Sequence, residues 1–335
     1  MQRMMVVGMG ITGRAVATAL QQRGIDVVAL DDRISDELRS WSTDHNLVVH
    51  TPGDVNIDAL LAQVNGVLPA PGLPDHHPIF AAAAQAKAPI MSEFDLAALW
   101  DDRPAVAITG TDGKTTVVTL VERMLEQSGI TAKAVGNTDT PWVEAIDDPA
   151  TDVFVVEASS FRLGHSQHFS PSIGTWLNFG PDHLDAHRDL SGYEAAKAAI
   201  WSQLGPDALA VANRDDIVVS GHASMISTSD VETFGAGEPS TSRDHGVIDG
   251  VLVSGGHELI AISELIRTLP HDILNGLAAS ATALRAGARH AVVADVLRNF
   301  AGLEHRVEFI AEIDGVRYIN DSKATTPHAA AAALG

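Results

Sequence analysis

The sequence has 335 residues, of which 45% are hydrophobic, and a formal net charge of −21 from 43 acidic and 22 basic side chains. This composition excludes a disordered chain, and the length predicts two domains with part of a third. The negative field repels phosphate backbones and anionic lipid, so we expect no nucleic-acid or membrane partner. No apolar run approaches the ~20 residues of a membrane span, no cleavable signal pattern precedes the first glycine-rich turn, and the absence of cysteine excludes disulfides and thiolate metal sites. We therefore expect a cytoplasmic protein.

Apolar, β-branched runs alternate with helix-length amphipathic stretches from the N-terminus onward. This alternation predicts a parallel α/β sheet. The expected strands are Met4–Val7, Val27–Leu30, Leu47–Val49, Val67–Leu68 and Ala88–Met91. The polar segment Asp101–Pro104 is typical of a linker, so we expect a Rossmann-like N-terminal domain over residues 1–102.

A second α/β series follows and predicts a central mononucleotide-binding domain over residues 103–302. Its expected strands are Ala105–Thr109, Val153–Glu157, Ile173–Leu177 and Ala208–Ala212, and its expected helices are Thr115–Ser128, Tyr193–Leu204, His271–Ala286 and Ala291–Phe300. Residues 217–260 predict small irregular strands or loops. Two strand-like runs, Val307–Ile313 and Val316–Ile319, and an alanine-rich helix start predict the beginning of an incomplete third α/β domain over 303–335.

The first glycine motif, Gly8–Gly13, has the pattern G-x-G-x-x-G between a predicted strand and a predicted helix. Backbone amides at such a helix start can hold a diphosphate. Asp31 ends the next strand, where dinucleotide-binding folds place a ribose-binding acid. Three interpretations are open: a nicotinamide cofactor of an oxidoreductase, another nucleotide diphosphate, which we favour, or a purely structural turn.

The second glycine motif, Thr109–Thr116, ends in the G-K-[ST] of a phosphate-binding loop and again joins a strand to a helix. Glycines let the backbone approach the phosphates, Lys114 can reach the β and γ phosphates, and the Thr115 hydroxyl can bind magnesium. The loop is shorter than the standard one, because Ile108 stands where the first glycine would lie. An ordinary turn is the alternative, but the motif predicts a nucleoside triphosphate site.

Candidate metal ligands follow two later strands. Glu157 ends one strand, and the segment Asn178–Asp185 follows the next with His183 between Asp182 and Asp185. Oxygen ligands suit magnesium, and an imidazole can complete a second site. A helix cap for Glu157 and a solvated turn for His183 are the alternatives. The remaining candidate histidines lack a strand-end context and are expected in loops or on the surface: His45, His50, His76, His77, His165 and His168.

Together these motifs resemble the Mur ligases, the ATP-dependent amino-acid-adding enzymes of peptidoglycan synthesis. The matching segments are the turn at 8–13, GTDGKTT at 110–116, GNTDTP at 136–141, EASSF at 157–161, NFGPDHLD at 178–185, YEAAK at 193–197, HDILN at 271–275, GLEHR at 302–306 and NDSKAT at 320–325. The last segment is most similar to the members that add D-glutamate to UDP-N-acetylmuramoyl-L-alanine. The resemblance implies a monomeric cytoplasmic enzyme that uses ATP and two magnesium ions to make an acyl phosphate.

The resemblance also implies site residues. The substrate would be bound by Ile11 and Thr12 at the diphosphate, Asp31 and Arg33 near the uracil, Gly72 in the same cleft, and Asn137 and Ser159. ATP would be bound by Gly110, Thr111, Asp112, Gly113, Lys114, Thr115, Thr116, Asn275, Arg306 and Asp321. The metal ligands would be Thr115 and Glu157 for one magnesium, and His183 with N-carbamylated Lys197 for the other. The implied catalytic set is Lys114, His183, Lys197 and Lys323.

Four residues depart from the usual family pattern: Asp112, Asp139, Arg162 and Asp272. None removes an expected metal ligand. The family's third domain is longer than residues 303–335, so we expect a fragment that binds its substrates but turns over slowly. The alternatives are a non-catalytic nucleotide-binding module derived from such a ligase, or a related ligase such as folylpolyglutamate synthase. For Lys197, an ordinary salt bridge on an amphipathic helix is the alternative to carbamylation.

Overall fold

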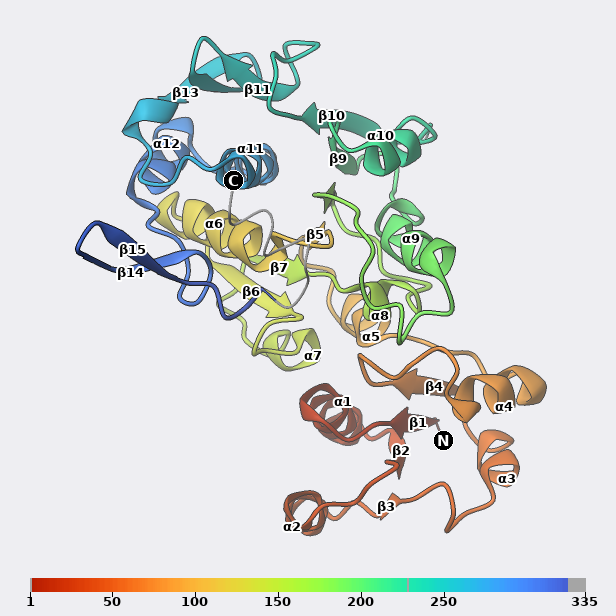
Figure 1. Ribbon diagram of the computed structural model, residues 1–335. Coiled ribbons are helices and arrows are strands. Elements are labelled where there is room, and N and C mark those ends of the chain that lie inside the picture. The colour runs from red at the N-terminus through yellow and green to blue at the C-terminus, as the bar shows by residue number, and fades with distance from the viewer. Residues whose placement is uncertain (1, 228, 325–335) are drawn as a thin grey trace.

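The computed structural model describes residues 2–227 and 229–324, and it confirms the predicted α/β class (Figure 1). The N-terminal part is a four-stranded parallel sheet in the order β3-β2-β1-β4. Its elements are β1 Arg3–Val7, α1 Ile11–Gln22, β2 Asp26–Leu30, α2 Asp36–Asp44, β3 Val49–His50, α3 Ile57–Leu61, β4 Gly66–Pro69 and α4 Pro78–Ala86. The expected strand at Ala88–Met91 is reduced to one bridge between Ile90 and Val67, because Pro89 has no N–H to donate.

Glycines are required in the turn from β1 to α1. Gly8 has a φ of +88°, and a Cβ there would lie 2.8 Å from the Cβ of Ala70. A Cβ on Gly13 would lie 1.9 Å from the carbonyl oxygen of Gly8. The turn therefore has no room for a side chain at Gly8 or Gly13. Because no side chain covers it there, the N-terminus of α1 is accessible to a ligand at the carboxyl edge of the sheet.

Helix α5, Glu93–Trp100, lies between the two sheets (Figure 1) but packs with two short helices of the central part, α7 Trp142–Ala145 and α8 Ser160–Leu163. Its Asp95 is fully buried and accepts backbone N–H groups from Ser92, Gln167, His168 and Phe169. The neighbouring Phe94 ring contacts Trp142 and Phe169. One short segment thus fixes the junction through a carboxylate and an aromatic side chain.

We expect Asp95→Ala to lower the free energy of unfolding by about 3 kcal/mol or more, because several buried N–H groups would lose their acceptor. Urea unfolding followed by tryptophan fluorescence measures this change. Asp102→Ala is the matched control, since Asp102 is exposed in the adjoining segment, and its effect should stay within about 0.5 kcal/mol. Equal effects of the two substitutions would show that the Asp95 bonds do not hold the junction.

The central part is built on a nine-stranded sheet in the order β13-β12-β11-β10-β9-β8-β5-β7-β6. The strands are β5 Ala105–Thr109, β6 Ala132–Gly136, β7 Val153–Glu157, β8 Ile173–Trp176, β9 Leu209–Asn213, β10 Asp230–Phe234, β11 His245–Ile248, β12 Val251–Ser254 and β13 His257–Ala261. Strands β5 to β11 pair in parallel, and β12 and β13 extend the sheet as antiparallel strands. The helices are α6 Lys114–Gln127, α7 Trp142–Ala145, α8 Ser160–Leu163, α9 Leu190–Ala198, α10 Ile217–Ala223, α11 Pro270–Arg285 and α12 His290–Asn299, with single 3₁₀ turns at Ala199–Trp201 and Ile262–Glu264.

Alternate residues of the central strands face two separate hydrophobic clusters. Val106 and Ile108 of β5 join the cluster beneath α6, α11 and α12, whereas Ala105 and Ala107 join the cluster that contains Trp176. Figure 1 shows α6, α11 and α12 together on the first of these faces. The sheet is therefore buried on both sides, as parallel sheets are, and its carboxyl edge remains available for a site.

The short helices α7 and α8 were not expected from the sequence, and two further elements of the central part differ from the sequence prediction. Strand β6 was not expected; it is an edge strand whose Lys133 is exposed, so it lacks the continuous apolar run of a central strand. Helix α10 lies within 217–260, where strands or loops were expected. It begins because the Asp216 carboxylate caps the N–H groups of Val218 and Val219.

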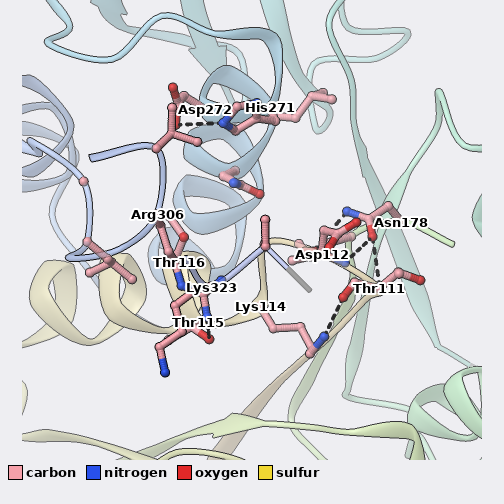
Figure 2. A pocket seen from close by; sticks show the side chains of 18 of the residues that line it. Thr111, Asp112, Lys114, Thr115, Thr116, Asn178, His271, Asp272, Arg306 and Lys323 are labelled. Atoms are coloured by element: carbon pink, nitrogen blue, oxygen red, sulfur yellow. Dashed lines mark hydrogen bonds and ion pairs between the residues drawn. The ribbon is translucent and has the colours of Figure 1, made fainter. Parts of the chain in front are cut away.

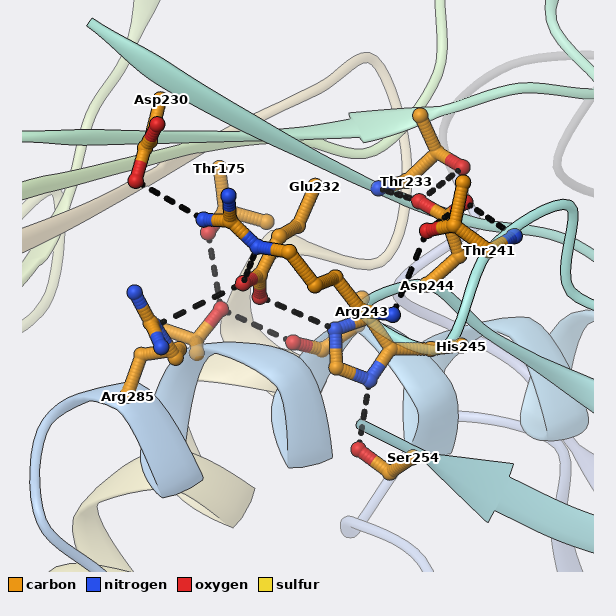
Figure 3. A network of polar contacts seen from close by, with 12 residues as sticks. Thr175, Asp230, Glu232, Thr233, Thr241, Arg243, Asp244, His245, Ser254 and Arg285 are labelled. Carbon is orange, nitrogen blue, oxygen red and sulfur yellow. Dashed lines mark hydrogen bonds and ion pairs between the residues drawn. The ribbon is translucent and has the colours of Figure 1, made fainter. Parts of the chain in front are cut away.

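A buried polar network joins β10, β11 and β12 to α11 (Figure 3). The carboxylate of Glu232 is 3% exposed and lies 3.3 Å from His245 Nε2, 3.4 Å from Arg243 Nε and 3.7 Å from Arg285 Nε. The other ring nitrogen of His245 bonds to the hydroxyl of Ser254. Burial raises the pKa of Glu232, but the bond to His245 and the two arginines outweigh it, so the net pKa lies below the ordinary value of 4.5.

This depressed pKa predicts acid-sensitive stability. The ionised Glu232 contributes fully above pH about 4.5, and the contribution is lost as the pH falls through the lower pKa of the folded state. We expect Glu232→Gln to lower stability at pH 7 by about 3 kcal/mol and to flatten the acid dependence of the urea midpoint. Glu258→Gln, on the exposed side of β13, should leave both unchanged. A variant curve parallel to that of the wild type would contradict this assignment.

The last described elements form an antiparallel hairpin, β14 Glu308–Ile313 and β15 Val316–Asn320, as the sequence predicts. The alanine-rich helix expected after it lies outside the described residues. Several apolar side chains of the hairpin are about half exposed: Phe309, Ile310, Ile313, Val316, Tyr318 and Ile319. None of the helices in the described ranges combines the length and apolar composition that a bilayer crossing requires.

Candidate nucleotide and substrate site

The second glycine motif forms the turn between β5 and α6. Gly113 has a φ of +85°, and a Cβ there would lie 2.5 Å from Asn275 Oδ1 on α11. The backbone N–H groups of Thr111 and Asp112 both donate to Asn178 Oδ1 at 2.9 Å, and Asn178 Nδ2 donates back to the Asp112 carbonyl at 3.1 Å. The turn is thus clamped between α11 and the segment after β8. Sequence reasoning missed the role of Asn178, although it opens the NFGPDHLD segment.

This turn lines a cavity of about 440 Å³ at the carboxyl edge of the sheet. Figure 2 shows its side chains converging from the turn, from α11 and from the segment before and after the hairpin. The residues predicted for ATP that line it are Thr111, Asp112, Gly113, Lys114, Thr115, Thr116, Asn275, Arg306 and Asp321, and Lys323 joins them. Gly110 does not line the cavity; its carbonyl instead accepts bonds from two lysines.

Lys114 is held against the turn that it follows. Its Nζ donates to the carbonyls of Gly110 and Thr111, both at 2.8 Å. Burial lowers the pKa of Lys114, and the nearby carboxylates of Glu157, Asp112 and Asp182 oppose that change. The Lys114 ammonium therefore lies beside the glycine turn and close to carboxylates. A phosphate oxygen of a bound nucleotide can replace one of the carbonyls as its hydrogen-bond acceptor.

The predicted metal ligands are only partly gathered. Glu157 Oε1 accepts from Asn137 Nδ2 at 3.0 Å, while Glu157 Oε2 is buried with no hydrogen-bond partner in the described part of the chain. Thr115 Oγ1 accepts from Arg306 at 3.1 Å. Glu157 and Thr115 line the same cavity, and an orphaned carboxylate oxygen with a threonine hydroxyl fits the oxygen ligands that magnesium prefers. The first predicted magnesium site is therefore chemically compatible with the residues present.

The second predicted metal site is less complete. His183 lines the cavity with Asp182, whose carboxylate lies 3.3 Å from His183 Nε2, but the imidazole is 48% exposed. Asp185 is exposed and is not among the residues that line the cavity. Across residues 2–227 and 229–324, no three or more histidine, aspartate or glutamate side chains are gathered closely enough to form a ready-made metal site.

Lys197 is buried in α9, and its Nζ donates to the Gly110 carbonyl at 2.6 Å and lies 4.6 Å from the centre of the Tyr193 ring. Burial places the pKa of Lys197 well below 10.5, and the charge of Lys114 lowers it further. The carboxylates of Asp182 and Asp112 oppose this lowering of the Lys197 pKa. The residue lies behind the turn and does not line the cavity itself.

The residues predicted for the UDP-substrate lie on the carboxyl edge of the N-terminal sheet and across the junction. Asp31 accepts the backbone N–H groups of Met9 at 2.6 Å and Arg33 at 2.9 Å. Ile11 is 69% exposed at the start of α1, and Gly72 is an exposed left-handed turn residue after β4. The structure thus brings four predicted substrate positions to the carboxyl edge of the N-terminal sheet: Ile11, Asp31, Arg33 and Gly72. Ser159 instead lies beyond β7; it is buried, and its hydroxyl has no hydrogen-bond partner in the described chain.

Arg162 joins this edge to the nucleotide cavity. Its guanidinium is 4% exposed and donates to Glu93 at 2.9 Å, to Asn137 Oδ1 at 3.2 Å and to Thr12 Oγ1 at 3.0 Å. Two predicted substrate residues from different domains are therefore linked by one side chain. The sequence identified Arg162 only as a departure from the family pattern, because its partners are distant along the chain.

The geometry first defines a class. A lysine and threonine at the start of the helix after a glycine turn, a carboxylate on the neighbouring strand and a mostly parallel sheet are the features of P-loop nucleotide-binding α/β proteins. Two family models match the chain: the Mur ligase middle domain over residues 108–283, and the Mur ligase MurD-like N-terminal domain over residues 2–92.

Comparison with individual proteins agrees with these matches. A UDP-N-acetylmuramoylalanine--D-glutamate ligase of Frankia casuarinae is 38% identical over 98% of this chain and 71% of its own length. The ligase of the same name from Pelotomaculum thermopropionicum is 35% identical over 99% of this chain and 74% of its own. The chain belongs to the Mur ligase family.

Solved structures give the same fold. The UDP-N-acetylmuramate:L-alanyl-gamma-D-glutamyl-meso-diaminopimelate ligase from Neisseria meningitides aligns with a TM-score of 0.60 at 16% identity, over 91% of this chain and 99% of that one. The UDP-N-acetylmuramate-alanine ligase from Thermotoga maritima aligns with a TM-score of 0.55 at 21% identity, over 98% and 76%. At such identities these structures support the fold alone.

Proposed function

We propose that this chain is an ATP-dependent ligase of peptidoglycan synthesis that adds D-glutamate to UDP-N-acetylmuramoyl-L-alanine. The relatives that cover nearly the whole chain carry that activity in their names. The observation that carries the proposal is the connection between two sites. The triphosphate turn and Glu157 line one cavity, and Arg162 links Asn137 of that cavity to Thr12 at the start of α1.

The chemistry follows from the weakness of a carboxylate as an acyl donor. A carboxylate oxygen of the alanyl group attacks the γ-phosphorus of ATP, and ADP leaves. The amine of D-glutamate then attacks the acyl carbon, the amine loses a proton and inorganic phosphate leaves with its bridging oxygen. Negative charge collects on the transferring oxygens, so fixed cations accelerate both steps.

The residues of the cavity supply that stabilisation. Lys114 would exchange its carbonyl contacts for β- and γ-phosphate oxygens, with Lys323 facing the transferring group. Asn275, Arg306 and Asp321 would surround the nucleoside. Thr115 and Glu157 would hold one magnesium ion, and His183 with a carbamylated Lys197 the other. Bound magnesium supplies neutralisation of the phosphate charge.

Carbamylation of Lys197 has a physical basis in its surroundings. Burial lowers the pKa of the Lys197 amine and so increases the share of its neutral form, and a neutral amine adds carbon dioxide to give a carbamate and a proton. The product is a carboxylate-like oxygen donor beside the turn. Incubation with ¹³C-bicarbonate should give a carbamate carbon resonance in the wild type that is absent from Lys197→Gln and retained in Lys87→Gln. Equal spectra would exclude the modification.

The cytoplasmic location and the monomeric state stay predictions. Sedimentation velocity tests the monomeric state directly.

Nucleotide turnover tests the proposed function. ADP formation should require UDP-N-acetylmuramoyl-L-alanine and should not respond to UDP-N-acetylmuramate, which lacks the alanyl carboxylate. D-Glutamate should yield the amide product, and L-glutamate should not. ATP binding without substrate-dependent ADP formation would instead favour the non-catalytic module, and turnover with a folate substrate would favour a related ligase.

A further inference from the structure

Three side chains from separate segments form a chain of contacts outside the residues named above. His187 Nε2 lies 2.9 Å from Ser160 Oγ, and His187 Nδ1 lies 3.5 Å from Asp75 Oδ2. Ser160 begins α8 directly after β7, His187 belongs to the segment between β8 and α9, and Asp75 belongs to the N-terminal domain between β4 and α4. The imidazole therefore bridges the two domains.

The imidazole is enclosed. It is 4% exposed at its side chain and stacks on Phe161, with ring centres 5.1 Å apart and planes 16° apart. Burial lowers the pKa of His187, and the nearby Asp75 carboxylate opposes this lowering only in part. A neutral ring has one donor and one acceptor. The two contacts place the proton on Nδ1 toward the carboxylate and leave Nε2 to accept from the serine hydroxyl.

Backbone contacts connect this bridge to the nucleotide cavity. The His187 N–H donates to the carbonyl of His183 at 2.9 Å, and the Ala186 N–H donates to the same carbonyl at 3.1 Å. His183 has a φ of +52°, a conformation that costs a non-glycine residue energy and needs support from its surroundings. The Asp75 N–H donates to the Ala186 carbonyl at 2.8 Å, and Asp75 Oδ2 accepts from the Arg188 N–H at 3.2 Å. The turn that presents His183 is thus held from the opposite domain.

We propose that His187 is a positioning residue that couples the substrate-binding N-terminal domain to the nucleotide cavity. Asp75 fixes the imidazole, and the imidazole fixes the turn that carries His183. Substrate bound beside Gly72, three residues from Asp75, then stabilises the arrangement of His183 before phosphoryl transfer. This inference rests on the proposed function, because it assigns the N-terminal edge to the substrate.

Hydrogen exchange provides a test that does not depend on turnover. UDP-N-acetylmuramoyl-L-alanine alone should slow exchange at the Gly8–Gly13 turn and also at residues 180–189 of the wild type. His187→Phe preserves the stacked ring but removes both polar contacts, so it should retain the first effect and lose the second. Asp75→Ala, at a partly exposed loop position, should act in the same direction and serves if the phenylalanine variant does not fold.

A matched control is available on the other side of the junction. Arg23 of the N-terminal domain pairs with Asp147 of the central part at 2.8 Å, so Asp147→Ala also removes one interdomain contact but should keep protection at 180–189. In steady-state assays we expect His187→Phe to lower kcat for ADP formation by about tenfold or more, with KM for both substrates nearly unchanged. If His187 had only a structural role, His187→Phe would lower the stability of the protein without lowering kcat at unchanged KM.

The outcomes separate the two proposals. If the substrate does not protect the Gly8–Gly13 turn of the wild type, the proposed function fails. If it protects that turn but protection at 180–189 is absent, or persists in both His187→Phe and Asp75→Ala, the coupling role of His187 is overturned.

Discussion

Replacing Lys114 with methionine is expected to lower substrate-dependent ADP formation by about 10²- to 10³-fold. Methionine keeps much of the length of the side chain but cannot carry a charge, so the developing charge on the γ-phosphate loses a fixed cation. Lys114 is the only lysine of the turn and emerges beside the carbonyls of Gly110 and Thr111. The measurement is the initial rate of ADP release at saturating UDP-N-acetylmuramoyl-L-alanine.

Stability separates this effect from unfolding. Burial of the Lys114 ammonium is unfavourable, which is why its pKa is lowered. The methionine variant should therefore unfold at the same urea concentration as the wild type or at a higher one. Lys133→Met, at an exposed position of edge strand β6, should change neither rate nor stability. A Lys114→Met enzyme that retains more than about a third of the wild-type rate would contradict the phosphate role.

Glu157→Gln is expected to give the second large effect, a loss of about 10²-fold in rate together with a higher magnesium requirement. Glutamine has nearly the same shape and can still accept the bond from Asn137, but it lacks the charge that a divalent cation needs. Because Glu157 Oε2 has no partner in the described chain, removal of its charge should not destabilise the protein. Rates measured over a range of magnesium concentrations test the prediction.

Glu126 lies on the exposed side of α6, so Glu126→Gln is the matched control and should leave the magnesium dependence of the rate unchanged. If Glu157→Gln lowered the rate but left the magnesium dependence of the wild type intact, the carboxylate would act on the cavity without holding a metal.

The sequence predicted the parts of the molecule that depend on local order. The family resemblance and the α/β fold are confirmed, because glycine turns between strands and helices have fixed spacing. The turn residues from Thr111 to Thr116 are neighbours along the chain, so their convergence on one cavity follows from the P-loop itself. Helix α11 could be predicted from its long apolar period, and Asn275 then follows within the HDILN segment.

The contacts that depend on tertiary packing could not be predicted in the same way. Arg162 reaches Thr12 across 150 positions of sequence, and His187 reaches Asp75 across 112, so no spacing rule relates them. The environment of Lys197 is equally inaccessible, since its lowered pKa results from burial behind a turn that lies far away in sequence. The position of His187 at the end of the D-H-L-D-A-H run was the one local signal that could have identified it.

Trapping the activated acid reports directly on the transfer of phosphate to the alanyl carboxylate. ATP, magnesium and UDP-N-acetylmuramoyl-L-alanine are mixed with the chain without D-glutamate, and tritiated borohydride is then added. Borohydride reduces an acyl phosphate to the alcohol, so we expect tritium in a UDP-muramoyl alaninol, and this label should be absent without ATP and strongly reduced in Lys114→Met. ADP formation without any labelled alcohol would contradict the transfer of phosphate to the alanyl carboxylate.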